Sequence, residues 1–332
     1  MHTEDLDDFT HVEYPESPDK GGKPVYIHSR DRFYTYSRRL GNGNYGDVYK
    51  YASQDGYSVV VKVFKAQREV DKDCNDTSDL VTAACMRGGS NHVLDQRCVG
   101  GVLVMESMDG DLHAFAKKHP RFATLETAID CIQQLAYGLD CIHTSGEWYT
   151  DIKPENILWK MTPEGPYFCW GDLEFCQQGG KVVITHSPPE GRSCSEHCAV
   201  FGFGMLTMWI MHKFHSETLH DHPYKTNWRK HPMFNQAGTK EMHEIKHDVI
   251  KGYKRGIDAY PLARQTKRML RRMVDVLPER RPGIKEVKTA MHGESQLDTL
   301  YECIKMKWFY KQYPPGTSKR KMDKDWLVNG LR

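Results

Sequence analysis

Short apolar or alternating segments predict strands in the first 170 residues of the chain. The segments are 33–36, 47–52, 58–64, 101–106 and 167–170. From Leu125 to His143 the apolar residues recur every three or four positions, which predicts a long amphipathic helix. The apolar run Ala199–Met211 is too short to span a bilayer and predicts a core helix.

Composition excludes several classes of protein. The 332 residues with 39% hydrophobic content suffice for one large domain or two packed lobes. A net charge of only +2 gives no indication of nucleic-acid binding. The ten cysteines lack paired CxxC spacing and are interpreted as thiols of a reducing compartment. The acidic start, residues 1–8, is unlike a signal peptide, so an intracellular protein without a membrane segment is expected.

Both ends of the chain differ from its middle. Residues 1–30 are polar and contain Pro and Gly, which predicts an extended or disordered arm. Residues 299–332 are basic and are interpreted as a C-terminal extension.

Five histidines between His212 and His231 have no cysteine at zinc-ligand spacing, so a polar insert is favoured over a metal site.

The most informative segment is Tyr149–Leu158. Asp151, Lys153 and Asn156 place a carboxylate, an ammonium and an amide within six residues, and Pro154 is expected to keep the segment out of a helix. Phosphoryl transfer to a hydroxyl needs these groups: Asp151 to accept the proton, Lys153 to balance phosphate charge and Asn156 to hold a metal ion. The segment resembles the catalytic loop of eukaryotic-type Ser/Thr protein kinases.

A glycine-rich segment precedes it, formed by Gly41, Asn42, Gly43, Asn44, Tyr45 and Gly46. Such glycines let a hairpin lie close over phosphates and donate backbone N–H groups. A dinucleotide-binding turn is the alternative, but it requires a helix after the third glycine. Here residues 47–52 alternate like a strand, which favours the glycine hairpin of kinases.

The resemblance implies a nucleotide site for ATP between two lobes. Lys62 would be the phosphate-binding lysine, Val48, Val60 and Leu158 would contact the nucleotide, and Met105 would be the gatekeeper. Glu106 and Met108 would offer backbone groups to the adenine edge, and Asp111 would reach the ribose.

The resemblance also implies a Mg²⁺ site at Asn156 and Asp172, whose oxygens are ligands that hard cations prefer. Leu173 would replace Phe in the metal-binding triplet, and Glu174 would replace its Gly and point outward. The carboxylate that pairs with Lys62 is left open between Asp79 and Glu69.

Two further matches concern the larger lobe. Glu190 resembles the end of the activation segment and is expected to pair with Arg281, because a buried Glu needs a cation. Thr150 stands where the family has Arg, and Ala199 where it has Asp. Without that Arg, activity independent of activation-loop phosphorylation is predicted.

The resemblance covers roughly residues 33–295 and implies an α+β bilobal kinase fold, with a small lobe at 31–106 and a mainly helical lobe at 107–298. The implied function is transfer of the ATP γ-phosphoryl group to Ser or Thr hydroxyls of proteins, in the cytoplasm or nucleus. A nucleotide-binding pseudokinase that acts as a scaffold is the alternative, and a small-molecule kinase is a third reading. The chain's departures from the family pattern resemble divergent kinases of large DNA viruses, which would place it in a host cell.

Overall fold

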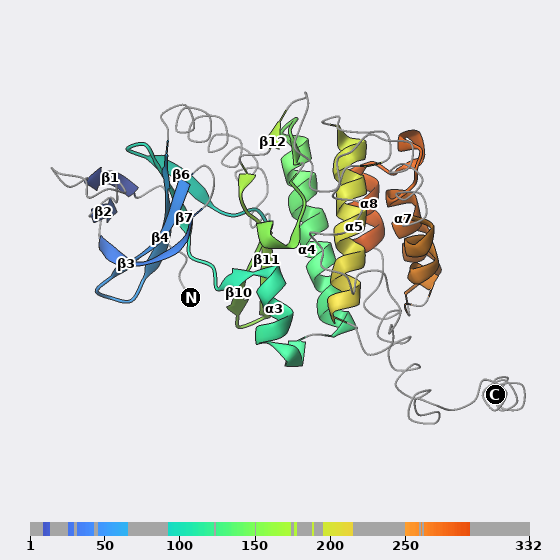
Figure 1. The fold of residues 1–332 in the computed structure, drawn as a ribbon, viewed down its shortest axis with the longest axis horizontal. Helices are drawn as coiled ribbons and strands as arrows, with labels where there is room; N and C mark the ends of the chain where they lie inside the picture. The colour runs from blue at the N-terminus through green and yellow to red at the C-terminus, as the bar shows by residue number, and fades with distance from the viewer. Residues whose placement is uncertain are drawn as a thin grey trace, which may run out of the picture.

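The computed structural model describes a defined set of residues. They are 9–13, 26–29, 32–42, 46–65, 92–122, 124–149, 151–173, 176–177, 188, 195–214, 250–258, 260 and 262–292. These residues form a lobe built on a β-sheet and a lobe that is mainly helical, as Figure 1 shows. The predicted α+β fold with two lobes is confirmed.

The small lobe contains a seven-stranded antiparallel sheet in the order β1-β2-β3-β4-β5-β7-β6 within the described residues. Its strands are β1 (Phe9–Glu13), β2 (Tyr26–Ser29), β3 (Phe33–Asn42), β4 (Gly46–Ser53), β5 (Ser58–Phe64), β6 (Gln96–Val99) and β7 (Val102–Glu106). Four of the five segments expected to be strands lie in this sheet, and the fifth, 167–170, lies in β11 (Gly165–Trp170) of another sheet.

Strands β1 and β2 lie in the region for which the sequence predicts an extended or disordered arm. They pair with each other and with β3, and β1 also lies beside β6. Phe9 packs its ring 5.5 Å from that of Tyr34, between ring centroids. These two segments are extended strands whose stability comes from long-range pairing and one buried ring, which no local apolar pattern indicates.

The alternation of β5 separates the two faces of this sheet. Val59 and Val61 join an aromatic cluster on one face, together with Tyr34, Tyr49 and Tyr51. Val60 packs on the other face in a cluster that includes Cys169 of the helical lobe. Because successive side chains of a strand point to opposite faces, Lys62 is on the same side as Val60.

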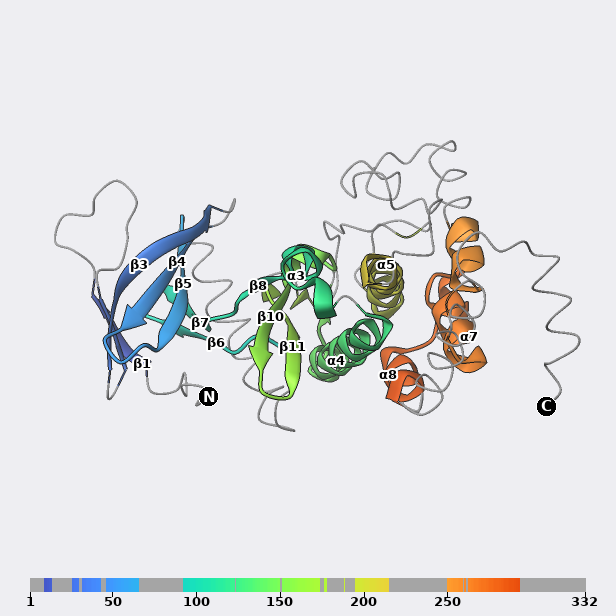
Figure 2. The ribbon, with the colours of Figure 1, turned by 90° about the horizontal axis from the view of Figure 1, so that it is seen from below.

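The helical lobe is built around two long helices, which lie side by side in Figures 1 and 2. Its helices are α3 (Leu112–Lys118), α4 (Leu125–Thr144), α5 (Glu196–Phe214), α7 (Arg264–Met273) and α8 (Ile284–His292), and residues 250–258 are also helical. Thr124 caps α4 by accepting a hydrogen bond from the backbone N–H of Thr127. The helices predicted from residues 125–143 and 199–211 are confirmed as α4 and α5.

Two small sheets sit between the main sheet and the helices. One has the order β11-β10-β8 and consists of β8 (Gly110–Asp111), β10 (Ile157–Thr162) and β11 (Gly165–Trp170). The other pairs β9 (Trp148–Tyr149) with β12 (Cys176–Gln177). The Trp170 indole N–H donates to the carbonyl of Leu135 over 2.8 Å, which attaches β11 to α4.

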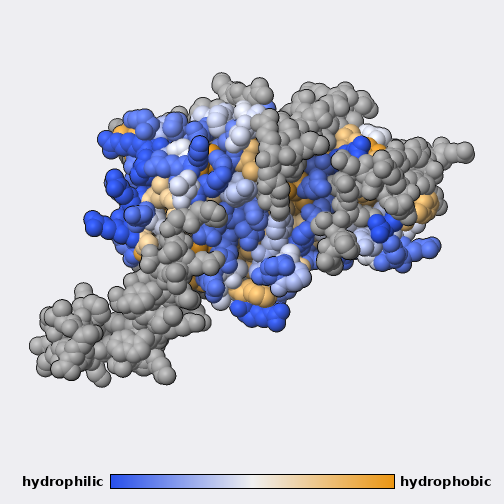
Figure 3. Space-filling view, turned by 180° about the vertical axis from the view of Figure 1, so that it is seen from behind, coloured by the Kyte–Doolittle hydropathy of each residue, from blue (hydrophilic) through white to orange (hydrophobic). Residues whose placement is uncertain are grey.

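The surface of the described residues is mainly hydrophilic on the face seen in Figure 3. Among these residues, none of the helices has both the length and the apolar character needed to cross a bilayer. Cys131, Cys169 and Cys198 are buried free thiols, as the sequence predicts. Cys98 differs from that prediction because it is disulfide-bonded.

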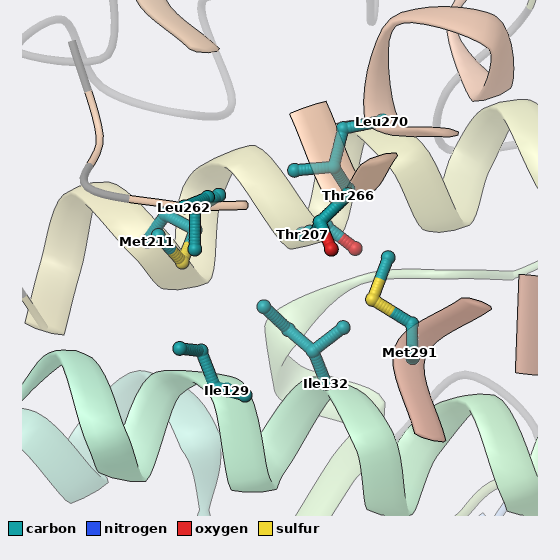
Figure 4. A pocket seen from close by; sticks show the side chains of 8 residues that line it. All are labelled: Ile129, Ile132, Thr207, Met211, Leu262, Thr266, Leu270 and Met291. Atoms are coloured by element: carbon teal, nitrogen blue, oxygen red, sulfur yellow. The ribbon is translucent and has the colours of Figure 1, made fainter. Parts of the chain in front are cut away.

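A small cavity of about 10 Å³ lies between α4, α5, α7 and α8, and Figure 4 shows its lining. Two threonines face it. The Thr207 hydroxyl donates to the carbonyl of Phe203 in its own helix over 2.9 Å. The buried hydroxyl of Thr266 has no hydrogen-bond partner within the described residues.

Thr266→Val is therefore expected to raise the free energy of unfolding by about 1 kcal/mol, because it removes a buried unsatisfied hydroxyl and keeps the side-chain shape. Thr207→Val is the matched control and should leave the stability unchanged or lower it. Urea unfolding of the two variants measures the difference. A loss of stability in Thr266→Val would contradict this assignment and indicate that the hydroxyl is satisfied, for example by a water in the cavity.

A buried histidine lies at the end of α4. His143 packs edge-on against Trp148, with 4.8 Å between ring centroids. Burial lowers the pKa of His143 from 6.5 to about 3. The folded protein therefore keeps this imidazole neutral, whereas the unfolded chain binds a proton below its ordinary pKa.

Because the unfolded state binds the extra proton, this residue should lower the stability as the pH falls from about 6.5 toward 3. The slope is at most about 1.4 kcal/mol per pH unit. His143→Phe, which retains an aromatic ring beside Trp148, should flatten the dependence of the unfolding free energy on pH between 7 and 5. An unchanged slope in the variant would exclude His143 as its source.

Candidate active site

The catalytic-loop segment is a compact turn with a buried carboxylate. Pro154 begins a single 3₁₀ turn, Pro154–Asn156, and strand β10 follows at Ile157. Asp151 is only 4% exposed, and its carboxylate contacts the ammonium of Lys153. The Asn156 amide donates to the Asp151 carboxylate over 3.0 Å and to its carbonyl over 2.9 Å. The three predicted groups are thus brought together by one turn.

The β10–β11 hairpin brings Asp172 to this turn. Ile157 at the start of β10 pairs with Trp170 at the end of β11. Just beyond this pair, the Gly171 N–H donates to the Asn156 carbonyl over 2.8 Å. Asp172 is the next residue after Gly171. This hydrogen bond therefore links Asn156 to the residue before Asp172, and these two are the predicted metal ligands.

Tyr149 fixes the other side of Gly171. Its fully buried hydroxyl donates to the Gly171 carbonyl over 2.7 Å, and its ring lies 5.1 Å from that of Trp170. Burial, together with the nearby Asp151 and Asp172 carboxylates, raises the pKa of Tyr149 well above its ordinary value. The hydroxyl therefore remains a neutral donor at any physiological pH.

Lys62 and Asp172 connect the two lobes. The Lys62 ammonium lies 3.4 Å from the Asp172 carboxylate, on the buried face of the sheet that the strand alternation predicts. Asp172 has a φ of 52°, a left-handed conformation that is uncommon for a residue with a side chain. Its carboxylate side chain remains 36% exposed, which leaves oxygen accessible to a ligand.

The structure describes the two strands of the glycine hairpin, β3 up to Asn42 and β4 from Gly46. Gly41 pairs with Val48, and Asn42 pairs with Asp47. A Cβ atom on Gly46 would lie 2.7 Å from the Val63 carbonyl, so this glycine is needed for the close approach of β4 to β5. At Gly41 a Cβ atom would meet open space.

The candidate adenine surface combines residues of both lobes. Val60 and Met105 of the sheet share a cluster with the partly buried Val48, Met108 and Leu158. Gly171 lies against this surface, since a Cβ atom there would be 2.9 Å from Cδ1 of Leu158. The apolar side chains predicted near the nucleotide therefore belong to one cluster, on the face of the sheet that also carries Lys62.

The segment from Glu106 to Asp111 joins the two lobes and is called the hinge below. Its residues make contacts that the sequence did not reveal. The Glu106 carboxylate contacts the ammonium of Lys160 on β10. The Asp111 carboxylate caps α3 by accepting from the Ala114 N–H over 2.9 Å. Only the position of Asp111 at the start of a helix signalled this role, and nothing in the sequence linked Lys160 to the hinge.

Several predicted residues lie outside the described residues. They are Gly43, Asn44, Tyr45, Glu69, Asp79, Thr150, Glu174 and Glu190. The expected partner of Glu190, Arg281, is buried and donates to the carbonyls of His197 and Asp275. Its guanidinium lies 4.8 Å from the ring centroid of Phe201 on α5. Arg281 thus joins α5 to the segment before α8.

The sequence matches the family model described as the protein kinase domain, over residues 34–292. This match covers more than half of the 332-residue chain. The chain belongs to the protein kinase family.

Individual kinases resemble this chain over shorter stretches. The sporulation protein kinase mde3 of Schizosaccharomyces pombe is 31% identical over 40% of this chain and 26% of its own length. A probable casein kinase I homolog of Encephalitozoon cuniculi is 29% identical over 38% of this chain and 41% of its own. Cyclin-dependent kinase 14 of Xenopus tropicalis is 30% identical over 40% and 32%. The matches therefore span less than half of these curated relatives.

Protein kinases generally use ATP and Mg²⁺, and the residues of this chain fit both. Mg²⁺ is usually held by one or two protein oxygens together with phosphate and water oxygens. Asp172 offers a partly exposed carboxylate, and the amide N of Asn156 is used by Asp151, which leaves its oxygen for a metal. Among the described residues there is no cluster of three or more His, Cys, Asp or Glu.

Tyr149→Phe should lower the free energy of unfolding by about 1 to 2 kcal/mol, because the Gly171 carbonyl loses its buried donor. Tyr34→Phe is the matched control: Tyr34 is equally buried, and its hydroxyl has no partner in the described part of the chain. Urea unfolding compares the two. Equal losses of stability would show that the Tyr149 hydroxyl contributes nothing specific.

Proposed function

We propose that this protein kinase is catalytically active and transfers the γ-phosphoryl group of ATP to Ser or Thr hydroxyls of protein substrates. The observation that carries the proposal is the junction of Asn156 and Gly171. It brings the cluster of Asp151, Lys153 and Asn156 next to the ion pair of Lys62 and Asp172.

Asp151 is the proposed acceptor of the substrate hydroxyl proton. Its carboxylate is held by the Asn156 amide and the Lys153 ammonium, so its orientation is fixed before a substrate arrives. An oriented base lowers the barrier by positioning, and no covalent intermediate on the protein is needed.

The two lysines would supply positive charge where phosphate charge develops. Lys153 holds its ammonium beside Asp151, and its side chain is 27% exposed. Lys62 is buried and held toward the helical lobe by Asp172. Bound ATP and Mg²⁺ would supply the transferable group and neutralise the remaining phosphate charge.

Specificity for Ser and Thr rests on Lys153, because the loops of tyrosine kinases usually differ at this position. The replacement of the family Arg by Thr150 supports activity that does not require phosphorylation of the activation loop.

Asp151→Asn should reduce phosphate incorporation into a generic protein substrate by at least about a hundredfold, the usual contribution of a general base. Asp258→Asn is the control, since it removes an exposed carboxylate that contacts Arg271 on the surface of the helical lobe. Incorporation is measured with radiolabelled ATP and Mg²⁺, and phosphoamino-acid analysis of the product identifies the hydroxyl used.

Equal, near-background incorporation by wild type and Asp151→Asn would contradict catalysis and favour the pseudokinase scaffold. Phosphotyrosine in the product would contradict the assignment to Ser and Thr while leaving the kinase activity in place.

A further inference from the structure

The β10–β11 hairpin of the helical lobe is bordered on both edges by chain that connects to the small lobe. On one edge, Trp170 donates its N–H to the His92 carbonyl over 2.9 Å and accepts from the Leu94 N–H over 2.7 Å. On the other edge, β8 pairs with β10, and the Asp109 N–H donates to the Trp159 carbonyl over 2.8 Å. The hairpin is thus the common support of both connections.

One ion pair joins this hairpin to the end of the small-lobe sheet. Glu106 is the last residue of β7, and its carboxylate contacts the ammonium of Lys160 on β10. Both side chains are 22% exposed, so solvent screens the pair less than a fully exposed one. The Lys160 ammonium also lies 5.1 Å from the ring centroid of Tyr167, its cross-strand partner on β11.

Glu106 is therefore held from two directions. Its backbone N–H donates to the Asp95 carbonyl over 3.0 Å, which fixes it to the segment before β6. Its side chain is fixed to β10 by Lys160. Two residues away on the same strand β10, Leu158 belongs to the apolar cluster that contains Met105, the residue before Glu106.

We propose that Glu106 and Lys160 are positioning residues for the nucleotide: their ion pair fixes the hinge backbone at a set distance from the β10 side of the adenine surface. This inference rests on the proposed function, because the adenine edge is expected to meet backbone groups of the hinge. A backbone group binds a ligand more tightly when it is ordered beforehand, because less entropy is lost on binding.

The adenine ring does not change during phosphoryl transfer, so its contacts are the same in the ground state and the transition state. Loss of such uniform binding raises KM and leaves kcat nearly constant. A pair that served only the folding of the domain would lower the stability without this selective effect on KM.

The chain offers a matched control in Lys288 and Asp140, which join α8 to α4. The Lys288 ammonium contacts the Asp140 carboxylate and lies 4.7 Å from the ring centroid of Tyr137. The side chain of Lys288 is 30% exposed and that of Asp140 is 15% exposed. This pair repeats the same combination of carboxylate, ammonium and tyrosine ring away from the hinge.

The experiment compares Glu106→Gln, Lys160→Met, the exchanged double variant Glu106→Lys with Lys160→Glu, and Lys288→Met. For each full-length protein, KM for ATP and kcat are measured, together with the Kd of a fluorescent ATP analogue and the melting temperature. The two single hinge variants should raise KM and Kd by about threefold to tenfold, the effect of a partly screened ion pair. The exchanged variant should recover most of the loss, and Lys288→Met should stay within about twofold of wild type.

Single hinge variants with wild-type KM and Kd would overturn the inference, as would an equal rise of both constants in Lys288→Met. Failure of the proposed function gives a different pattern: wild type then transfers no phosphate, and the Kd series alone decides the role of the pair. A wild type that binds no nucleotide removes the inference together with the proposed function.

Discussion

The hydrogen bond between the Gly171 N–H and the Asn156 carbonyl is the contact on which the site depends. It closes the open end of the β10–β11 hairpin. Asn156 is itself a residue of the site, and Gly171 directly precedes Asp172. The hydrogen bond fixes Gly171, and with it Asp172, beside the cluster around Asp151. The Tyr149 hydroxyl completes the arrangement by holding the Gly171 carbonyl, so both backbone groups of this glycine are occupied. A residue with such an occupied backbone can hold its neighbour Asp172 at the unusual φ of 52°.

The electrostatics of the site follow from how little water reaches it. Asp151 and Lys62 are both buried, and each has an opposite charge close by, in Lys153 and Asp172. Buried charges persist only when they are paired or hydrogen-bonded, because desolvation otherwise favours their neutral forms. One carboxylate beside Lys62, that of Asp172, comes from the opposite lobe. A phosphate group entering between the lobes would therefore meet positive charge that is already in place.

Much of this site could be predicted because its residues lie close together in the sequence or within one strand. Asp151, Lys153 and Asn156 fall within one turn, and the alternation of β5 alone is enough to put Lys62 on the face of Val60. The position of Asp172 after an apolar strand likewise follows from adjacent residues. Arg281 was singled out from a motif, although its described contacts are backbone carbonyls and the ring of Phe201.

What could not be predicted depends on pairing between distant residues. Strands β1 and β2 have weak local patterns and are stabilised by β3, β6 and the burial of Phe9. Lys160 looks like an ordinary solvated lysine in the sequence, and only the fold places it on Glu106, 54 positions away. The Tyr149 hydroxyl reaches Gly171 for the same reason. In each case pairing or packing between segments that are distant in the sequence decides the contact, and no local pattern specifies it.

The most direct test of the central claim is a crystal structure of the full chain with a non-hydrolysable ATP analogue and Mg²⁺. The convergence described here predicts Lys62 on the phosphates, Asn156 and Asp172 on the metal, and Asp151 facing the terminal phosphate. An analogue bound elsewhere, or a metal held without Asn156 and Asp172, would contradict the account.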